Sequence, residues 1–190
     1  MTNLTAALVL VLHTSLPKID QDRLKDVTDD MIAVVEDESS NGLFKSKIKN
    51  DEALAMLTAA VLNESGFSAD VENCKINGDG GKSIGLGQVM RGQNWEGNSR
   101  KKICSDRKLQ LRLALHVIDK CWVRTPRADA AFRCYTSGDA AKDSKTAKRE
   151  YSSYRKFKNV IDKFRAEERR VQEVKNNNEE IKQESVEGSV

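Results

Sequence analysis

The chain has 190 residues, 38% of them hydrophobic and 32% charged, so it can bury one core but is short for two full domains, and we expect one domain with extensions. No run approaches the ~20 apolar residues that span a bilayer, and we expect no stable membrane span. The net charge is +3, yet residues 82–158 hold 19 Lys and Arg against 7 Asp and Glu, a balance that would attract a polyanion such as nucleic acid or an anionic cell-wall polymer.

Residues 1–50 predict an N-terminal helical extension. Residues 4–12 (LTAALVLVL) have the length of the apolar part of a signal peptide, but no Lys or Arg precedes them. They are either a signal or membrane-associating segment or a buried first helix, which Pro17 ends. Residues 21–36 repeat apolar side chains at three- and four-residue spacing and predict an amphipathic helix with an acidic outer face.

The next predicted helix carries the candidate catalytic group. Residues 52–63 (EALAMLTAAVLN) are apolar nearly all round and rich in strong helix formers, which indicates a helix buried at the centre of a domain. It delivers Glu64 at its C-terminal end. Burial raises the pKa of a carboxyl group and lets it keep a proton near neutral pH. Glu64 is therefore a candidate general acid, the alternative being a solvated residue at a helix end.

Beyond Glu64 a Gly-rich segment gives way to further helices. Eight of the eleven glycines lie between residues 66 and 97, which predicts turns with a short hairpin. Apolar spacing predicts helices over residues 109–122 and 126–135, and from residue 144 onward. The main domain is therefore expected at residues 51–165. Residues 166–190 are charged and lack aromatic side chains, which is typical of a solvated, disordered tail.

Four cysteines permit two disulfides with three possible connectivities. Outside the reducing cytosol we expect them to pair, Cys74 with Cys134 and Cys104 with Cys121; otherwise they are small buried thiols. No pair has the C-x-x-C spacing of a zinc or redox site, and the two histidines are isolated. We therefore expect no metal and no cofactor.

Three short motifs follow one another along the chain: Glu64-Ser65-Gly66, Ser83-Ile84-Gly85-Leu86-Gly87-Gln88 and Tyr135-Thr136-Ser137-Gly138. In order and spacing they resemble the E-S-G, S-x-G-L-M-Q and A-Y-N-S-G signatures of soluble lytic transglycosylases and goose-type lysozymes. The resemblance covers about residues 52–157. It implies a mainly α, lysozyme-like α+β fold, in which a helical domain and a small Gly-rich lobe flank a saccharide cleft. It also implies that the chain cleaves the MurNAc-β-1,4-GlcNAc bond of peptidoglycan glycan strands.

The resemblance assigns roles within the motifs. Gln88 would bind sugar hydroxyls, Tyr135 would orient the Glu64 carboxyl, and Gly85 would let the backbone approach a sugar ring. The implied substrate-binding residues are Ser65, Ser83, Gly85, Leu86, Gln88, Tyr135, Thr136 and Ser137. Gly87 stands where a bulky residue such as Met is usual and Thr136 where Asn is common, so the saccharide subsites need not follow the family's shape.

Two chemistries are open for Glu64. In a lytic transglycosylase it would act as acid and then as base, while the C6 hydroxyl of the substrate closes a 1,6-anhydro ring. In a goose-type hydrolase water attacks, and a second carboxylate assists. Asp79, within Gly78-Asp79-Gly80-Gly81, is the candidate for that second group, because goose-type relatives carry a similar turn; otherwise it is an ordinary turn residue.

Two further interpretations belong to other classes of function. The chain would bind peptidoglycan, or form part of a virion, without turnover, although the intact glutamate argues against this. Nucleic acid is not an expected partner, because the basic segment lacks interleaved aromatic residues and a recognisable binding motif. We expect a periplasmic or secreted protein, or one carried in a phage virion, where virion proteins would be its partners.

Overall fold

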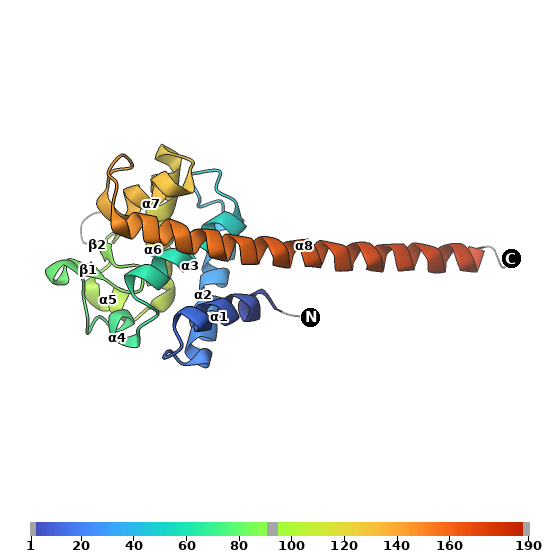
Figure 1. The fold of residues 1–190 in the computed structure, drawn as a ribbon, viewed down its shortest axis with the longest axis horizontal. Helices are drawn as coiled ribbons and strands as arrows, with labels where there is room; N and C mark the ends of the chain where they lie inside the picture. Colours follow the sequence, from blue (N-terminus) through green and yellow to red (C-terminus); the bar gives the residue numbers. More distant parts are fainter. Residues whose placement is uncertain (1–2, 91–94, 188–190) are drawn as a thin grey trace.

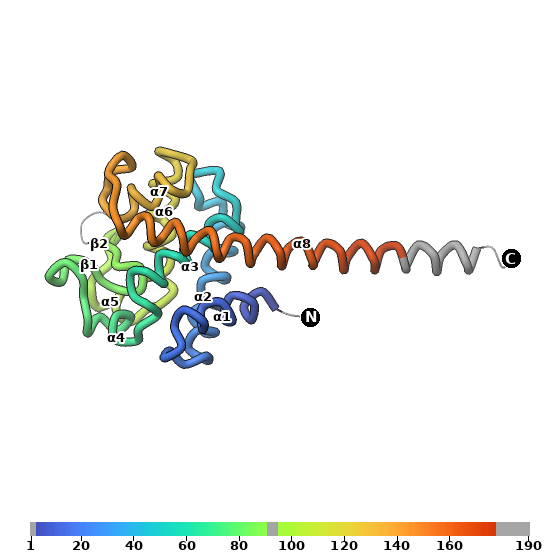
Figure 2. The backbone as a smooth tube through the Cα atoms, viewed as in Figure 1, coloured from blue at the N-terminus to red at the C-terminus, as the bar shows by residue number. Residues whose placement is uncertain are grey.

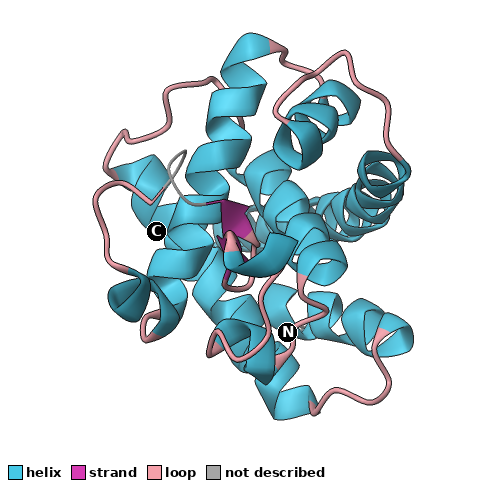
Figure 3. Cartoon of the chain, turned by 90° about the vertical axis from the view of Figure 1, so that its left-hand side faces the viewer, coloured by secondary structure: helices cyan, strands magenta, loops and turns pink. Residues whose placement is uncertain are grey.

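The computed structural model describes residues 3–90 and 95–187, with side chains as far as residue 177. The fold is mainly helical, as the sequence predicts, with one small two-stranded antiparallel hairpin at the centre of the view in Figure 3. In chain order the elements are α1 (Leu4–Ser15), α2 (Gln21–Ser40), α3 (Asn50–Glu64), α4 (Ala69–Glu72), η1 (Asp79–Gly81), β1 (Ser83–Ile84), β2 (Val89–Met90), α5 (Arg100–Cys104), α6 (Arg107–Arg124), α7 (Ala128–Ser137) and α8 (Lys145–Glu187).

Helix α3 lies at the centre of the domain, which confirms the prediction from its apolar sequence. Every residue from 53 to 61 is buried, because α2, α6 and α8 all pack against this helix. Its Ala, Leu and Met residues favour helix and bring no polar side chain that would need a partner. The buried helix holds its C-terminal residue, Glu64, in a fixed place.

Helix α1 is a buried first helix in the structure. Leu8 and Leu12 are fully buried, and α1 packs against both α2 and α8. The chain turns back between α1 and α2 (Figure 2). The Thr5 hydroxyl donates a hydrogen bond of 2.6 Å to Asp29 on α2. Residues of α1 to α3 belong to the same apolar cluster, so the expected boundary at residue 50 does not separate two cores. Among the described helices, none is long and apolar enough to cross a membrane.

Helix α8 continues well past the domain (Figure 1). Its 43 residues span roughly 65 Å at the rise of an α-helix. Residues 166–187, expected to be disordered, are helical here, while residues 188–190 lie outside the described part. Arg165 pairs with Glu168 at 2.8 Å and Glu167 with Arg170 at 3.8 Å, the i,i+3 spacing that supports a solvated helix. The described side chains beyond residue 166 are nearly all exposed.

The disulfide pairing predicted from the sequence is wrong. Cys74 is bonded to Cys104 and Cys121 to Cys134, and each pair has a Cα–Cα distance of 5.6 Å. The Gly-rich segment folds back so that the residues after α4 meet the end of α5. Helices α6 and α7 are packed neighbours joined by a short connection, which brings the second pair together. The first cysteine in the sequence is therefore bonded to the second, and the third to the fourth.

Candidate active site

Glu64 is the last residue of α3, and its side chain is partly buried. Burial raises the pKa of this carboxyl group, and the negative charge of Asp79 raises it further. A hydrogen bond with Glu150 and the positive charge of Arg149 act in the opposite direction. The carbonyl end of a helix also disfavours a negative charge. Glu64 is thus a carboxyl group that the fold biases towards its protonated form, as a general acid requires.

Glu150 on α8 is a second carboxyl group, beside the partly buried Glu64. Its side chain is fully buried, and among the described residues no donor reaches either of its oxygens. The Glu64 carboxyl group lies beside it, close enough for a hydrogen bond between the two side chains, and the charge of Arg149 also acts on it. Two ionised carboxylates only accept, so this bond exists only when one of the two groups carries a proton. Burial, and then Glu64, raise the pKa of Glu150 to about 10, which places the proton on Glu150.

Tyr135 connects helix α7 to the turn between the two strands. Its hydroxyl donates a hydrogen bond of 2.6 Å to the carbonyl oxygen of Gly87. Burial, followed by the charges of Glu64 and Glu150, raises the pKa of this hydroxyl well above 10, so it remains a phenol. Because its proton is given to Gly87, Tyr135 can face Glu64 only as an acceptor. The expected orienting role of Tyr135 is therefore restricted to accepting from a protonated Glu64.

Asp79 lies in an exposed turn close enough to Glu64 for its charge to act there. Its φ of +49° is a left-handed conformation, and its carboxylate accepts a 2.9 Å hydrogen bond from the Ser83 hydroxyl. Gln88 holds the other side of this turn: its Oε1 accepts from the Gly78 amide at 2.8 Å and its Nε2 donates to the Gly85 carbonyl at 2.9 Å. Gln88 is thus already engaged within the protein, with one amide hydrogen left for a ligand.

Gln110 on α6 binds the second motif, residues 83–88, to the helices of the domain. It is buried, its Oε1 accepts from the Leu86 amide at 2.8 Å, and its Nε2 donates to the carbonyls of Glu72 and Ile103. Gly85 has a φ of +74°, and a Cβ atom there would lie 2.7 Å from Gln110 Oε1, so a side chain is excluded for two reasons. The Leu86 side chain is fully buried, which makes it a core anchor and not a surface for sugar.

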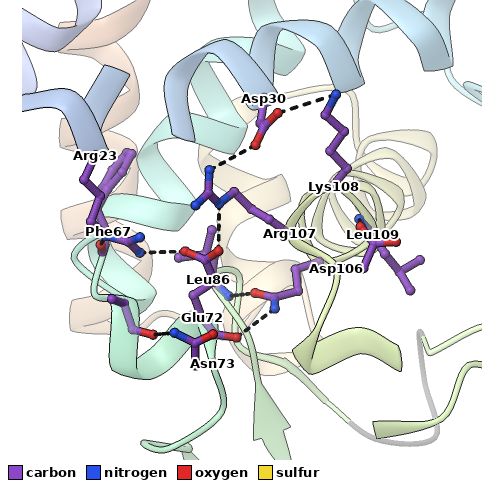
Figure 4. A network of polar contacts seen from close by, with 12 residues as sticks. Arg23, Asp30, Phe67, Glu72, Asn73, Leu86, Asp106, Arg107, Lys108 and Leu109 are labelled. Carbon is purple, nitrogen blue, oxygen red and sulfur yellow. Dashed lines mark hydrogen bonds and ion pairs between the residues drawn. The ribbon is translucent and has the colours of Figure 1, made fainter. Parts of the chain in front are cut away.

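An ion-pair network around Glu72 holds the beginning of the Gly-rich segment (Figure 4). Glu72 accepts from Arg23 on α2 and from Arg107 on α6, both at 2.7 Å. Arg107 also contacts Asp30 on α2 at 3.1 Å. Because all four side chains are largely shielded from solvent, these charged hydrogen bonds are stronger than exposed ion pairs. The Gly-rich segment is therefore attached to the helices at Glu72 and at Leu86.

The hydroxyl groups of the first and third motifs bond to their own helices. Ser65 donates to the carbonyl of Val61 at 2.9 Å. Thr136 and Ser137 likewise donate to carbonyls four residues earlier, at 3.0 and 2.7 Å. These bonds satisfy carbonyls near helix ends, a common duty of Ser and Thr. The structure gives the hydroxyl groups of these three residues a local structural role within their own helices.

No protein-family model, curated protein or solved structure matches the chain. Across residues 3–90 and 95–187, no group of three or more His, Cys, Asp and Glu side chains is placed to hold a metal ion. A cavity of about 320 Å³ lies between α1 and α2, but none of the motif residues lines it. The groups that the fold does bring together are Glu64, Glu150, Tyr135 and Asp79.

Sequence reasoning missed two residues of this site, Glu150 and Arg149. The signal for Glu150 is its register: Ala147, Glu150, Tyr154 and Phe157 recur at three- and four-residue spacing, and all are buried. An acidic residue within an apolar helical stripe marks a buried carboxyl group. Arg149 is exposed and donates a 3.1 Å hydrogen bond to the Asn63 carbonyl, next to Glu64. No motif points to that contact.

Proposed function

We propose that the chain cleaves the glycan strands of peptidoglycan, with Glu64 as the general acid. The observation that carries the proposal is the pairing of the fully buried Glu150 carboxyl group with the partly buried Glu64 carboxyl group at the end of the central helix. Burying an unpaired carboxyl group is costly, so an arrangement like this is more often functional than structural. The resemblance of the three motifs to lytic transglycosylases and goose-type lysozymes supplies the substrate class.

The chemistry needs only groups that the site contains. Protonated Glu64 gives its proton to the glycosidic oxygen, the bond from that oxygen to the sugar C1 breaks, and an oxocarbenium-like centre develops. The Glu64 carboxylate then removes a proton from the C6 hydroxyl of the same sugar, whose oxygen attacks C1 and closes a 1,6-anhydro ring. Glu64 ends protonated, ready for another turnover. The charge of the exposed Asp79 acts on Glu64, so Asp79 would also stabilise positive charge that develops on a sugar bound beside Glu64.

Hydrolysis is the second candidate chemistry, and the position of Asp79 favours it. The charge of Asp79 acts on Glu64, so the two carboxyl groups are close enough to act on the same bound sugar. In this case Glu64 protonates the leaving oxygen while Asp79 assists a water molecule that attacks C1. The bond from Ser83 holds Asp79 in its turn and would orient it for this task.

The test is digestion of purified peptidoglycan by the wild type, Glu64→Gln and Glu36→Gln. Gln is nearly isosteric with Glu but cannot donate a proton as an acid, so we expect Glu64→Gln to lose at least a hundredfold in rate. Glu36 is exposed on α2, and its Gln variant controls for the substitution itself. Retention of more than about a tenth of the wild-type rate in Glu64→Gln would remove Glu64 as the general acid.

Mass spectrometry of the products separates the two chemistries. Products with 1,6-anhydro ends, and an Asp79→Asn variant that keeps most activity, are the expected result for a lytic transglycosylase. Reducing ends that take up ¹⁸O from labelled water, together with a severe loss in Asp79→Asn, would identify a hydrolase. If the wild type leaves peptidoglycan intact, the chain is a binding or structural module.

We place the protein outside the cytosol, in the periplasm, secreted or in a phage virion. Two disulfides support an oxidising compartment, because thiols stay reduced in most cytosols. The basic balance of residues 82–158 suits a substrate that carries negative charge. In a virion, its partners would be virion proteins.

A further inference from the structure

We propose that Glu150 is a positioning residue that keeps its own proton and donates a hydrogen bond to the carboxylate form of Glu64. This inference rests on the proposed function, because it gives Glu150 a task in the cycle of Glu64. It begins from a geometric fact: Glu150 is fully buried, and neither of its oxygens has a donor among the described residues. An ionised carboxylate in that position would be buried without compensation.

The groups around Glu64 and Glu150 determine which of the two carboxyl groups donates the hydrogen bond. Tyr135 gives its proton to Gly87, so it cannot donate to Glu150. Arg149 is exposed and donates to the Asn63 carbonyl, and its charge acts on both carboxyl groups. Asp79 adds a negative charge on the Glu64 side. Glu150 is the more deeply buried of the two acids, so the proton stays on Glu150 and its hydroxyl points at Glu64.

This hydrogen bond opposes the effect of burial on the acidity of Glu64. Burial makes Glu64 a weak acid, which favours a stored proton but opposes its release. A neutral donor beside the carboxylate stabilises the form that remains after release without adding a charge. During a turnover, one proton leaves Glu64 for the glycosidic oxygen and one returns from the C6 hydroxyl or water. The proton of Glu150 is not consumed.

The test is a ¹³C NMR titration of the glutamate side-chain carboxyl groups in the wild type, Glu150→Gln and Glu150→Met. Gln keeps an N–H donor without a charge, so the apparent pKa of Glu64 should stay close to the wild-type value. Met has similar bulk but no donor, and the apparent pKa should rise by about one to two units, the size expected for losing a hydrogen bond to a charged group. The pH profile of peptidoglycan cleavage should shift upward in Glu150→Met and be preserved in Glu150→Gln.

Two outcomes would overturn the proposal. If Glu150 were ionised, Glu150→Gln would remove a negative charge and lower the pKa of Glu64. If the contact were only packing, Glu150→Met would leave the Glu64 titration unmoved. The titration needs no substrate, so it decides the role of Glu150 even if the chain fails to cleave peptidoglycan.

Thermal unfolding keeps the proposal testable if Glu150→Met does not fold. An acid whose pKa rises on folding, here from 4.5 to about 10, stabilises the fold fully below pH 4.5 and loses that contribution as the pH rises towards 10. Glu150→Gln does not titrate in this range. The Tm of Glu150→Gln should therefore gain on that of the wild type as the pH rises from 5 to 9, and a constant difference would show that Glu150 is not held protonated.

Discussion

The substitution Gly87→Ala tests how the second motif is packed against α6. A Cβ atom at Gly87 would lie 2.4 Å from the Ala114 Cβ and 3.0 Å from the Tyr135 hydroxyl. Carbon atoms pack at about 3.5–4.0 Å, so the turn or the helix must move by more than about 1 Å. The φ of Gly87 is not in the left-handed region, so space and not backbone strain excludes a side chain. This contact explains the absence of a bulky residue at Gly87.

The magnitude follows from two terms. Overpacking a core by one methyl group costs about 1–3 kcal/mol. The Tyr135 hydrogen bond ends on the carbonyl of Gly87 itself, and its loss would add about 0.5–1.5 kcal/mol. We expect Gly87→Ala to lose about 2–4 kcal/mol of unfolding free energy. Removing the opposing methyl should restore the fit: Gly87→Ala with Ala114→Gly should lose only the ~1 kcal/mol that Gly costs inside a helix.

The assay is urea denaturation of both single variants and the double variant, analysed as a double-mutant cycle. A coupling of about 2–4 kcal/mol between the two sites is expected, because the double variant should lose about 1 kcal/mol where the two single losses sum to about 3–5 kcal/mol. Ala59, buried on α3, contributes none of the three atoms nearest to a Cβ at Gly87 and provides the control: Ala59→Gly should add to Gly87→Ala without coupling. If Gly87→Ala and Ala114→Gly are additive, the close approach of the turn to α6 is refuted.

Two further predictions concern covalent links and the tail. Replacing Cys74 and Cys104 by Ser should lower the free energy of unfolding by about 3–4 kcal/mol, and replacing Cys121 and Cys134 by about 0.7 kcal/mol less, because the shorter separation of 13 residues, against 30, closes a smaller loop. Urea denaturation measures both losses. Non-reducing peptide mapping that links Cys74 to Cys134 would contradict the pairing. Removing residues 172–190 should leave Tm and activity nearly unchanged, because residues 172–177 are exposed; a large loss of activity would show that this arm docks near the site.

Helices were predictable where apolar spacing is unambiguous. The sequence of α3 is apolar on every side, and only a central position can bury such a helix. The end of α7 was also predictable, since Gly138 takes a φ of +76° and ends the helix. The tail was not, because solvated charged sequences with i,i+3 pairs are compatible with both helix and disorder.

The details of the site depend on contacts between distant segments. The motif identifies Gln88 and Leu86 but not the partners of their polar groups, which are Gly78, Gly85 and Gln110 in the structure. Disulfide pairing also depends on the folded chain, because four cysteines allow three connectivities and the sequence does not choose among them. Glu150 was within reach of the sequence, since the apolar stripe of α8 passes through it.

Each disulfide links segments that are neighbours along the chain, whereas the expected Cys74–Cys134 bond would have joined the Gly-rich segment to α7. One closes a ring within the Gly-rich segment and α5, the other a ring within α6 and α7. Neither joins the Gly-rich segment to α7, so the Tyr135–Gly87 hydrogen bond, and not a covalent bond, sets the distance between them. Disulfide formation therefore restrains each of the two segments separately and adds no covalent link between the Gly-rich segment and α7.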